Sequence, residues 1–421
     1  MRTITTLIAL LSAHALLGCS SSDPTPAPGP EDELLEAPAP GEGVQYRMTS
    51  VIEPGQEIER CQLFVAPPEG LNIQRDEVRY SGGSHHVLLY ATNYTEIPTE
   101  TRRGVPIDAA EVHDCKDGAT ADWEVSGVIS GSQSPEGNSL LGPLPEGVAV
   151  KVKPGTVLVM NTHYLNSSLD PMETDARINL YTIPDEEVKT EAGMLFHYNP
   201  IIRVPARGES SARMRCTTEQ DIFVVRIQSH MHRRGVGYVA NLVKSDDSTQ
   251  ELYAHDKWEQ VPSGEFDPVL EVKAGEALDY RCDYRNPEER DVVQGQTTRD
   301  EMCMLVGPYY PRSPSYENCR NGDGEFAGTW IGSGTATCAE SLACLSGARS
   351  PDEDQGFDSY GCVVDSCAGA GEELSAVLQC QWSQGHGACT DACAESPEAC
   401  GACIATACAD AVTACEAAAC E

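Results

Sequence analysis

Two histidines separated by one residue, His230 and His232, follow an apolar, β-branched run at residues 222–227. Residues two apart in a β-strand point to the same face, so both imidazoles can approach one ion. Imidazole nitrogen is a suitable ligand for copper, zinc, iron and nickel. The pair therefore predicts a metal site, although two solvated histidines on a half-exposed strand would show the same spacing.

Other segments carry side chains that could join this chemistry. His85 and His86 lie where a glycine-containing turn enters an apolar strand, and His163 follows another apolar run. Adjacent residues on an ideal strand face opposite ways, so one ion can take both His85 and His86 only if the strand is twisted or bulged. The thioether of Met302 is soft and would favour Cu(I), although a lone methionine more often packs in a core. Together these residues predict two copper sites of different softness.

The segments that must position these residues are strands. Between about 47 and 335 the chain consists of short β-type runs separated by Pro, Gly, Asn and Asp, and helical periodicity is scarce. Such a pattern predicts antiparallel sandwiches. A similar series of runs repeats from about 191, and 421 residues exceed the usual size of one core. We expect an all-β fold of two consecutive antiparallel, jelly-roll-like β-sandwich domains, at 47–190 and 191–335.

The last part of the chain, residues 336–421, has a different composition. It holds 12 of the 19 cysteines among Ala, Gly and acidic residues, which predicts a small, disulfide-rich, partly helical module. A zinc site at Cys400-x-x-Cys403 would need a second matching pair, and none has the usual spacing. The sequence leaves the connectivity open, but places three sets on short helices pinned by bridges: Cys389 and Cys393, Cys403 and Cys408, and Cys415 and Cys420.

The first residues predict export from the cytoplasm. Arg2, an apolar stretch and the series Leu16-Leu17-Gly18-Cys19 resemble a bacterial lipoprotein signal peptide over 1–19, in which Cys19 becomes the lipidated N-terminus. An ordinary cleaved secretory signal is the alternative. Residues 20–46 are rich in Pro, Gly, Ser and acids and predict a flexible tether. We expect a lipid-anchored protein of the bacterial cell envelope, at the outer membrane, without a later spanning segment.

The overall charge limits the partners. The formal net charge is −36 and the isoelectric point is near 4.5, which argues against nucleic acid or an anionic membrane surface, since both are polyanions. Membrane contact is then expected through the lipid anchor alone. The cysteine-rich module remains a candidate for protein contact.

In order and approximate spacing, the metal-ligating residues resemble the copper type II, ascorbate-dependent monooxygenases, and the resemblance covers about residues 50–330. It implies two coppers per chain, with ascorbate or another reductant as electron donor. The implied ligands of the electron-supplying copper are His85, His86 and His163, and those of the oxygen-binding copper are His230, His232 and Met302. The implied disulfides are Cys61–Cys115, Cys216–Cys319 and Cys282–Cys303, the last of which would hold Met302 near its copper.

The sequence departs from that family at informative positions. The family has Met, an aromatic residue and Cys at the positions of Val87, Tyr90 and Thr92, so the Met and the Cys are replaced here. Peptide-amidating members grip a carboxylate with Arg, Asn and Tyr, at positions occupied here by Gln228, Met304 and Val306. Without the guanidinium group at position 228, a peptide C-terminal glycine is not expected as the substrate. Arg226 could replace this cationic fork only if its side chain reached the carboxylate from a different position.

The resemblance implies hydroxylation of a C–H bond of a small organic substrate, with O2 and an external reductant. The alternative is a non-catalytic surface copper-binding or adhesion protein that retains the monooxygenase fold, since fold does not fix function. Four other histidines have no matching partners and are expected to be surface or structural: His113, His197, His255 and His386.

Overall fold

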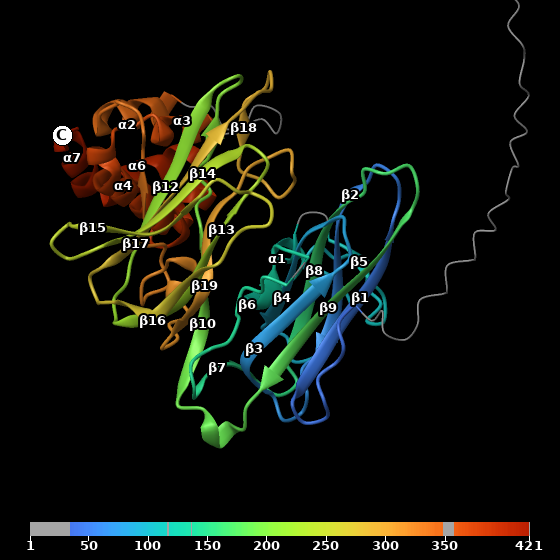
Figure 1. Ribbon diagram of the computed structural model, residues 1–421. Helices are drawn as coiled ribbons and strands as arrows, with labels where there is room; N and C mark the ends of the chain where they lie inside the picture. The colour runs from blue at the N-terminus through green and yellow to red at the C-terminus, as the bar shows by residue number, and fades with distance from the viewer. Residues whose placement is uncertain (1–33, 116–117, 136, 348–357, 421) are drawn as a thin grey trace, which may run out of the picture. The chain divides into compact units, whose positions relative to one another are not determined.

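The computed structural model describes residues 34–115, 118–135, 137–347 and 358–420 of the chain. The predicted signal peptide with Cys19, and the tether up to residue 33, lie outside these residues. Residues Leu34–Glu421 form one compact unit; Figure 1 labels many of its elements and colours them in chain order. Within it we call 34–190 the first half, 191–335 the second half, and 336–420 the C-terminal module; the predicted domain boundaries stay predictions.

The first half is built from two layers of strands. One layer contains, in spatial order, β1 (Gly43–Ile52), β9 (Met172–Thr182), β3 (Leu71–Tyr80) and β7 (Val148–Val152). The other contains β5 (His113–Asp114), β2 (Glu57–Val65), β8 (Val157–Leu165), β4 (Ser84–Thr92) and β6 (Val125–Ser132). The short helices α1 (Ala119–Asp122) and η1 (Asp185–Glu187) lie in the connections.

The second half repeats this layered arrangement. One layer contains β10 (Thr190–Tyr198), β19 (Cys303–Tyr310), β13 (Ile222–Met231) and β16 (Gly264–Val272). The other contains β15 (Thr249–His255), β14 (Gly235–Val243), β17 (Ala277–Arg285), β12 (Glu209–Thr217) and β20 (Gly328–Ile331). The remaining elements are the pair β11 (Arg203–Val204) and β18 (Val292–Val293), and η2 (Tyr316–Asn318). A short parallel pairing of β7 with β10 joins one layer of each half into a single eight-stranded sheet.

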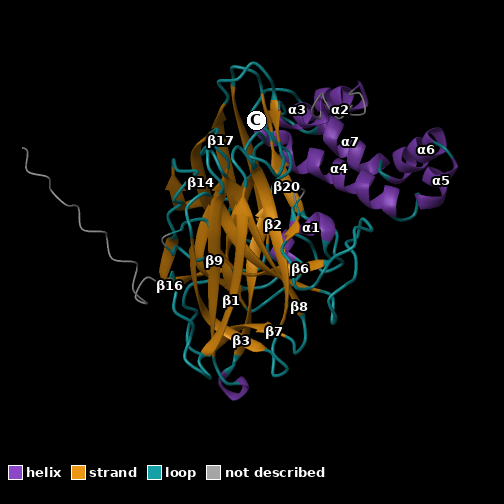
Figure 2. Cartoon of the chain, turned by 90° about the vertical axis from the view of Figure 1, so that its right-hand side faces the viewer, coloured by secondary structure: helices purple, strands orange, loops and turns teal. Residues whose placement is uncertain are grey.

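The C-terminal module is helical, as Figure 2 shows. Its α-helices are α2 (Cys338–Gly347), α3 (Asp358–Val364), α4 (Gly371–His386), α5 (Thr390–Glu395), α6 (Pro397–Ala407) and α7 (Ala409–Ala417), and η3 spans Ala368–Ala370. Its disulfides are Cys338–Cys415, Cys344–Cys362, Cys367–Cys420, Cys380–Cys408, Cys389–Cys403 and Cys393–Cys400. Each cysteine of the three expected sets therefore bonds outside its own set. The predicted fold class, all-β sandwiches followed by a small disulfide-rich helical module, is confirmed.

Helix α4 attaches the module to the edge strand β20. The backbone N–H of Trp330 donates to Ser375 Oγ at 2.8 Å, and Gln379 Nε2 donates to the carbonyl of Gly328 at 2.7 Å. These bonds occupy polar groups of an otherwise open sheet edge, which is a common site of unwanted strand pairing. The module is thus an ordered cover for this edge.

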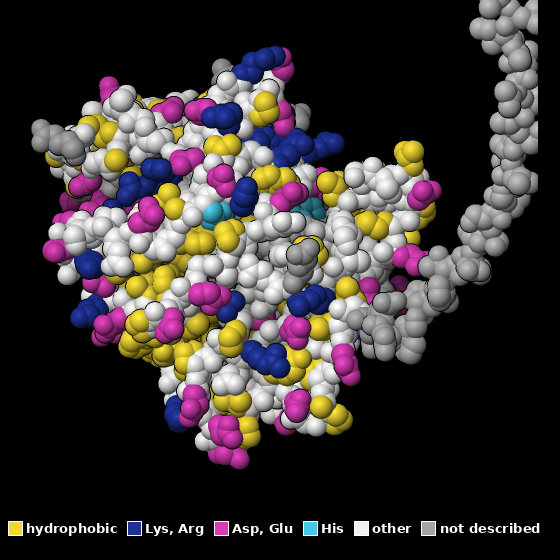
Figure 3. Space-filling model, viewed as in Figure 1, with side chains coloured by type: hydrophobic (Ala, Val, Ile, Leu, Met, Phe, Trp, Pro, Cys, Tyr) yellow, Lys and Arg dark blue, Asp and Glu magenta, His cyan; other side chains and the backbone are white. Residues whose placement is uncertain are grey.

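Among the described residues, no single helix is long and apolar enough to cross a membrane, although the bent pair α6 and α7 together reach that length and composition. On the face shown in Figure 3, basic side chains are interspersed among the acidic ones.

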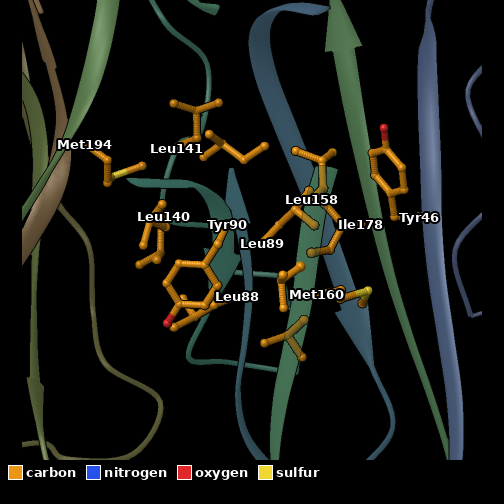
Figure 4. Close-up of a cluster of buried hydrophobic side chains, with 14 of the residues drawn as sticks. Tyr46, Leu88, Leu89, Tyr90, Leu140, Leu141, Leu158, Met160, Ile178 and Met194 are labelled. Carbon is orange, nitrogen blue, oxygen red and sulfur yellow. The ribbon is translucent and has the colours of Figure 1, made fainter. Parts of the chain in front are cut away.

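Each half has its own hydrophobic core. In the first half, Leu89 and Ile178 come from opposite layers and are fully buried between them, together with Met160 (Figure 4). The first eight residues of β8 are all buried, which requires cover on both faces because side chains alternate along a strand. Met304 and Val306 of β19 belong to this same core cluster. The second half therefore packs against the outer face of the β4 and β8 layer, where the predicted metal-ligating residues lie.

Candidate metal centre

The three histidines of the first half come from two paired strands. His86 of β4 lies directly opposite His163 of β8, and the register between these strands shifts between Ser84 and His86. His85 is therefore the extra residue of a bulge, the distortion that the sequence requires if both neighbours are to face one side. Its ring centroid lies 5.5 Å from that of His86 and 5.7 Å from that of His163.

Residues before the bulge fix its shape. Ser84 Oγ lies 3.0 Å from the carbonyl of His86 and 3.1 Å from that of His163, and so bonds both strands. Gly83 has a φ of +88°, and a Cβ there would lie 2.4 Å from Met172 Sδ. Only glycine fits such a turn without strain.

A carboxylate orients one of these rings. Glu57 Oε1 lies 3.1 Å from His163 Nε2 and accepts a second hydrogen bond at 2.7 Å from the backbone N–H of Thr298 in the second half. The hydrogen bond with His163 lowers the pKa of Glu57 to about 2. Nε2 of His163 is therefore occupied, which leaves Nδ1 as the nitrogen that could bind a metal.

The two histidines of the second half lie at and just after the end of β13. Their ring centroids are 5.3 Å apart, as expected for residues on one face of a strand. Gln133 of the first half holds His230 twice, since its Oε1 lies 2.5 Å from His230 Nδ1 and its Nε2 donates to the carbonyl of Ser229 at 2.9 Å. Nδ1 of His232 lies 3.1 Å from the carbonyl oxygen of Asp300. Both rings therefore have Nδ1 engaged and Nε2 available.

A buried carboxylate braces the turn after His232. Glu301 is fully buried and accepts from the backbone N–H groups of His232, at 3.0 Å, and Arg234, at 2.9 Å. Desolvation raises the pKa of Glu301 to about 7 despite these bonds. The adjacent Met302 is 9% exposed, and its carbonyl accepts from the Tyr284 hydroxyl at 2.7 Å.

The two histidine sets meet. The ring centroid of His85 lies 5.4 Å from that of His230 and 5.6 Å from that of His232, and the centroids of His86 and His230 are 5.7 Å apart. One ligand atom from each of His85, His230 and His232 falls within 4.8 Å of the others. The sequence assigned the histidines to separate sites on separate halves and gave no sign of this convergence.

The protonation and hydrogen bonding of these rings fit a metal. Burial lowers the pKa of His85 to about 4 and that of His232 to about 3, and it also lowers the pKa of His86 and His230. These four rings are thus neutral at pH 7, as metal ligands must be. Four nitrogens of the histidine cluster are buried without a hydrogen-bond partner, which is costly unless something binds them: His85 Nε2, His86 Nδ1, His163 Nδ1 and His232 Nε2.

A cavity of about 260 Å³ opens beside this cluster. His86, His230 and Met302 line it. The aliphatic and aromatic residues of its wall are Leu88, Tyr90, Leu140, Phe196, Tyr198, Met304 and Val306. The polar residues are Glu59, Thr120, Gln133, Asn161, Gln296 and Asn318. Among the residues that the structure describes, no lysine or arginine lines it. Met304 and Val306, which stand at two carboxylate-gripping positions of amidating enzymes, thus present apolar walls instead.

The other two positions of interest are engaged elsewhere. Gln228 is 1% exposed and donates to Ser263 Oγ at 3.2 Å. Arg226 forms an ion pair with Glu265 at 3.1 Å and lies within hydrogen-bonding distance, 3.4 Å, of the carbonyl of Ser139. Neither side chain lines the cavity, so Arg226 does not replace the missing cationic fork.

The structure contains the disulfides Cys61–Cys115, Cys216–Cys319 and Cys282–Cys303, the pairs that the resemblance implies. Of the remaining histidines, His197 is buried with its Nε2 2.8 Å from the carbonyl of Tyr316, and His113 and His386 contact backbone carbonyls. His255 lies nearer the cluster, with Nε2 2.7 Å from Ser229 Oγ.

Sequence reasoning missed the residues that orient the histidines. Gln133 lies in a connection that carries no motif, and nothing in the sequence around Glu57 distinguishes it from other acidic residues. Glu301 is part of the Asp300-Glu301-Met302-Cys303 segment, but nothing in that segment indicates which backbone groups it bonds.

Residues 192–325 match the family model described as copper type II ascorbate-dependent monooxygenase, C-terminal domain. The matched segment contains His230, His232, Met302 and the Cys282–Cys303 bridge. The match supports a copper-dependent oxidoreductase. It covers the metal-ligating residues of the second half of the chain and not those of the first half.

Proposed function

We propose that this protein is a copper-dependent monooxygenase that hydroxylates a C–H bond of a small organic substrate, with O2 and an external reductant such as ascorbate. The observation that carries the proposal is the convergence of five histidines from the two halves, with neighbouring ring centroids 5.3 to 5.7 Å apart, beside a cavity that His86, His230 and Met302 line. The family match of residues 192–325 supports the same chemistry.

In this proposal His86 and His163, with His85, hold one copper, and His230, His232 and Met302 hold the other. Copper supplies O2 binding and one-electron transfer. One oxygen atom enters the C–H bond and the other leaves as water, and ascorbate provides the two electrons that balance the reaction. Gln133 and the carbonyl of Asp300 keep Nδ1 of the second pair engaged, so that Nε2 of each ring is directed to its ion.

The cavity defines the substrate class. Its aromatic and aliphatic walls exclude water from the reacting bond and bind an apolar body. With no described cationic side chain in the lining, it offers a carboxylate no cationic partner. A small apolar or aromatic molecule fits these walls better than a peptide C-terminus does.

Oxygen uptake tests the proposal. Copper-loaded, ascorbate-reduced protein should consume O2 faster in the presence of members of a panel of phenethylamine-type and other hydrophobic substrates, with one hydroxylated product per O2. His232→Ala should abolish the substrate-dependent part, and His386→Ala, in the C-terminal module, should retain it. Firm copper binding without substrate-dependent uptake across the panel would favour the copper-binding or adhesion protein.

The proposed location is the bacterial cell envelope, with the protein anchored by lipid on Cys19. The Leu16-Leu17-Gly18-Cys19 series and the following Pro-rich segment support it. Incorporation of labelled palmitate that is lost in Cys19→Ala is the expected result, and release of unlabelled protein to the medium would contradict it.

A further inference from the structure

We propose that His85 is a ligand shared between the two sets. In the arrangement of this structure it completes a three-imidazole copper site with His230 and His232, while His86 and His163 remain the paired ligands of the first half. The inference rests on the proposed copper function and adds a ligand to its second site.

Distances give His85 no preference for its own half. Its ring centroid is 5.5 and 5.7 Å from those of His86 and His163, and 5.4 and 5.6 Å from those of His230 and His232. The grouping in which three ligand atoms lie within 4.8 Å of one another combines His85 with the second pair. Three imidazoles are a common donor set for copper and for zinc.

The backbone treats His85 and His86 differently. His86 pairs across the strands with His163, so its direction is fixed by the ladder between β4 and β8. His85 is the bulged residue and has no opposite residue in β8. Bulges commonly re-aim a side chain near functional sites, and this one leaves the ring of His85 free to be directed toward the second half.

The atoms that would meet are unoccupied by hydrogen bonds. Nε2 of His85 and Nε2 of His232 are both buried without a partner, and the ring of Trp258 lies edge-on to His85 at 5.8 Å. Two buried ring nitrogens without partners, on rings whose centroids are 5.6 Å apart, are costly unless a cation binds them.

Specific bonds hold the halves in the position that brings these atoms together. Gln133 of the first half bonds the ring of His230 and the carbonyl of Ser229, and the backbone of Thr298 bonds Glu57. Asn138 Nδ2 donates to the carbonyl of Val261 at 2.7 Å. The shared position of His85 therefore depends on a contact made by directed hydrogen bonds rather than by apolar surface alone.

The test disrupts the first site by replacing His163, and then measures whether copper binding at the second site depends on His85. In a His163→Ala background the full-length protein should bind one copper at the second site. Adding His85→Ala should weaken Cu(II) binding roughly 10–100-fold or more, since even loss of an outer ligand partner costs that much, and the electron paramagnetic resonance spectrum should lose the contribution of one imidazole nitrogen. The matched control is His113→Ala in the same background, a first-half histidine outside the cluster, which should change neither.

Equal Cu(II) affinity and spectrum with and without His85, or the same change on removing His113, would overturn the inference. Thermal unfolding of the metal-free variants separates a ligand effect from misfolding, and Zn²⁺ competition against a chromophoric chelator gives a second affinity that does not depend on redox state. Copper binding with the expected His85 effect but without O2 uptake would contradict the proposed function alone.

Discussion

The two halves position their metal-ligating residues by different means. In the first half, strand pairing sets His86 against His163, and a bulge supplies His85. In the second half, His232 lies beyond the strand, and a buried carboxylate and a disulfide next to Met302 hold the segment. The segment that matches the family model contains the metal-ligating residues of the second half and not those of the first.

The difference shows where each site is vulnerable. A set fixed by a strand ladder loses its geometry only when the sheet itself is disturbed. A set fixed by side-chain bonds can lose its metal while the sheet remains intact. Substitutions in the first half should therefore lower copper affinity only when they also disturb the sheet. Substitutions in the second half can lower copper affinity while the sheet stays intact.

The largest expected effects come from the two disulfides. By loop length, removing Cys61–Cys115 should cost about 4 kcal/mol in the free energy of unfolding, and removing Cys282–Cys303 about 3 kcal/mol, because the former closes the longer loop. Copper affinity of the second site should show the opposite order, since Cys303 is next to Met302. Denaturant unfolding and copper titration of the two double Cys→Ala variants provide the comparison, and a copper effect that simply follows stability would break it.

Glu301→Ala should come next, at about 3 kcal/mol. Arg234 is 3% exposed and would lose one of its two carboxylate partners. Because Glu288 still pairs with it, the loss of unfolding free energy should lie at the low end of the range for a broken buried ion pair. The exposed Glu96 provides the control, because Glu96→Ala should change the free energy of unfolding by less than about 0.5 kcal/mol. Similar unfolding midpoints for both variants would show that the second half is not held by this carboxylate.

Gln133→Leu should weaken copper binding at the second site by roughly 10–100-fold, as is usual when a metal-ligating histidine loses its orienting partner. The first site, measured separately in a His230→Ala and His232→Ala background, should keep its affinity. If both sites weakened equally, Gln133 would act on the packing of the halves and not on the ring of His230.

Glu57→Gln should have the smallest effect, less than about tenfold on the first copper. The amide oxygen of Gln can still accept from His163 Nε2 and from the backbone of Thr298, so the geometry is kept while the charge is lost. Chelator competition measures the affinity. A loss as large as that of Gln133→Leu would mean that the charge, and not the strand ladder, positions His163.

Much of the fold followed from local patterns. Short β-type runs with turn residues predicted the strands, and the spacing of His230 and His232 predicted that they share a face. The alternation of side chains along a strand also indicated that one ion could take both His85 and His86 only if the strand were twisted or bulged there. These are properties of a few neighbouring residues, so they can be read from the chain.

What the sequence did not predict depends on how distant parts pack. The meeting of His85 with His230 is set by contacts between the halves, and Gln133 and Glu57 gain their roles only through that contact. In the C-terminal module, the spacing of cysteines is compatible with many pairings, and the helix packing chooses among them, as for Cys389 with Cys403.

The copper content of the purified full-length protein tests the central claim most directly. After loading and dialysis, two coppers per chain are expected, falling to one in His86→Ala with His163→Ala and also to one in His230→Ala with His232→Ala. A single zinc per chain, or a copper content that neither pair of substitutions changes, would contradict a two-copper centre built from these histidines.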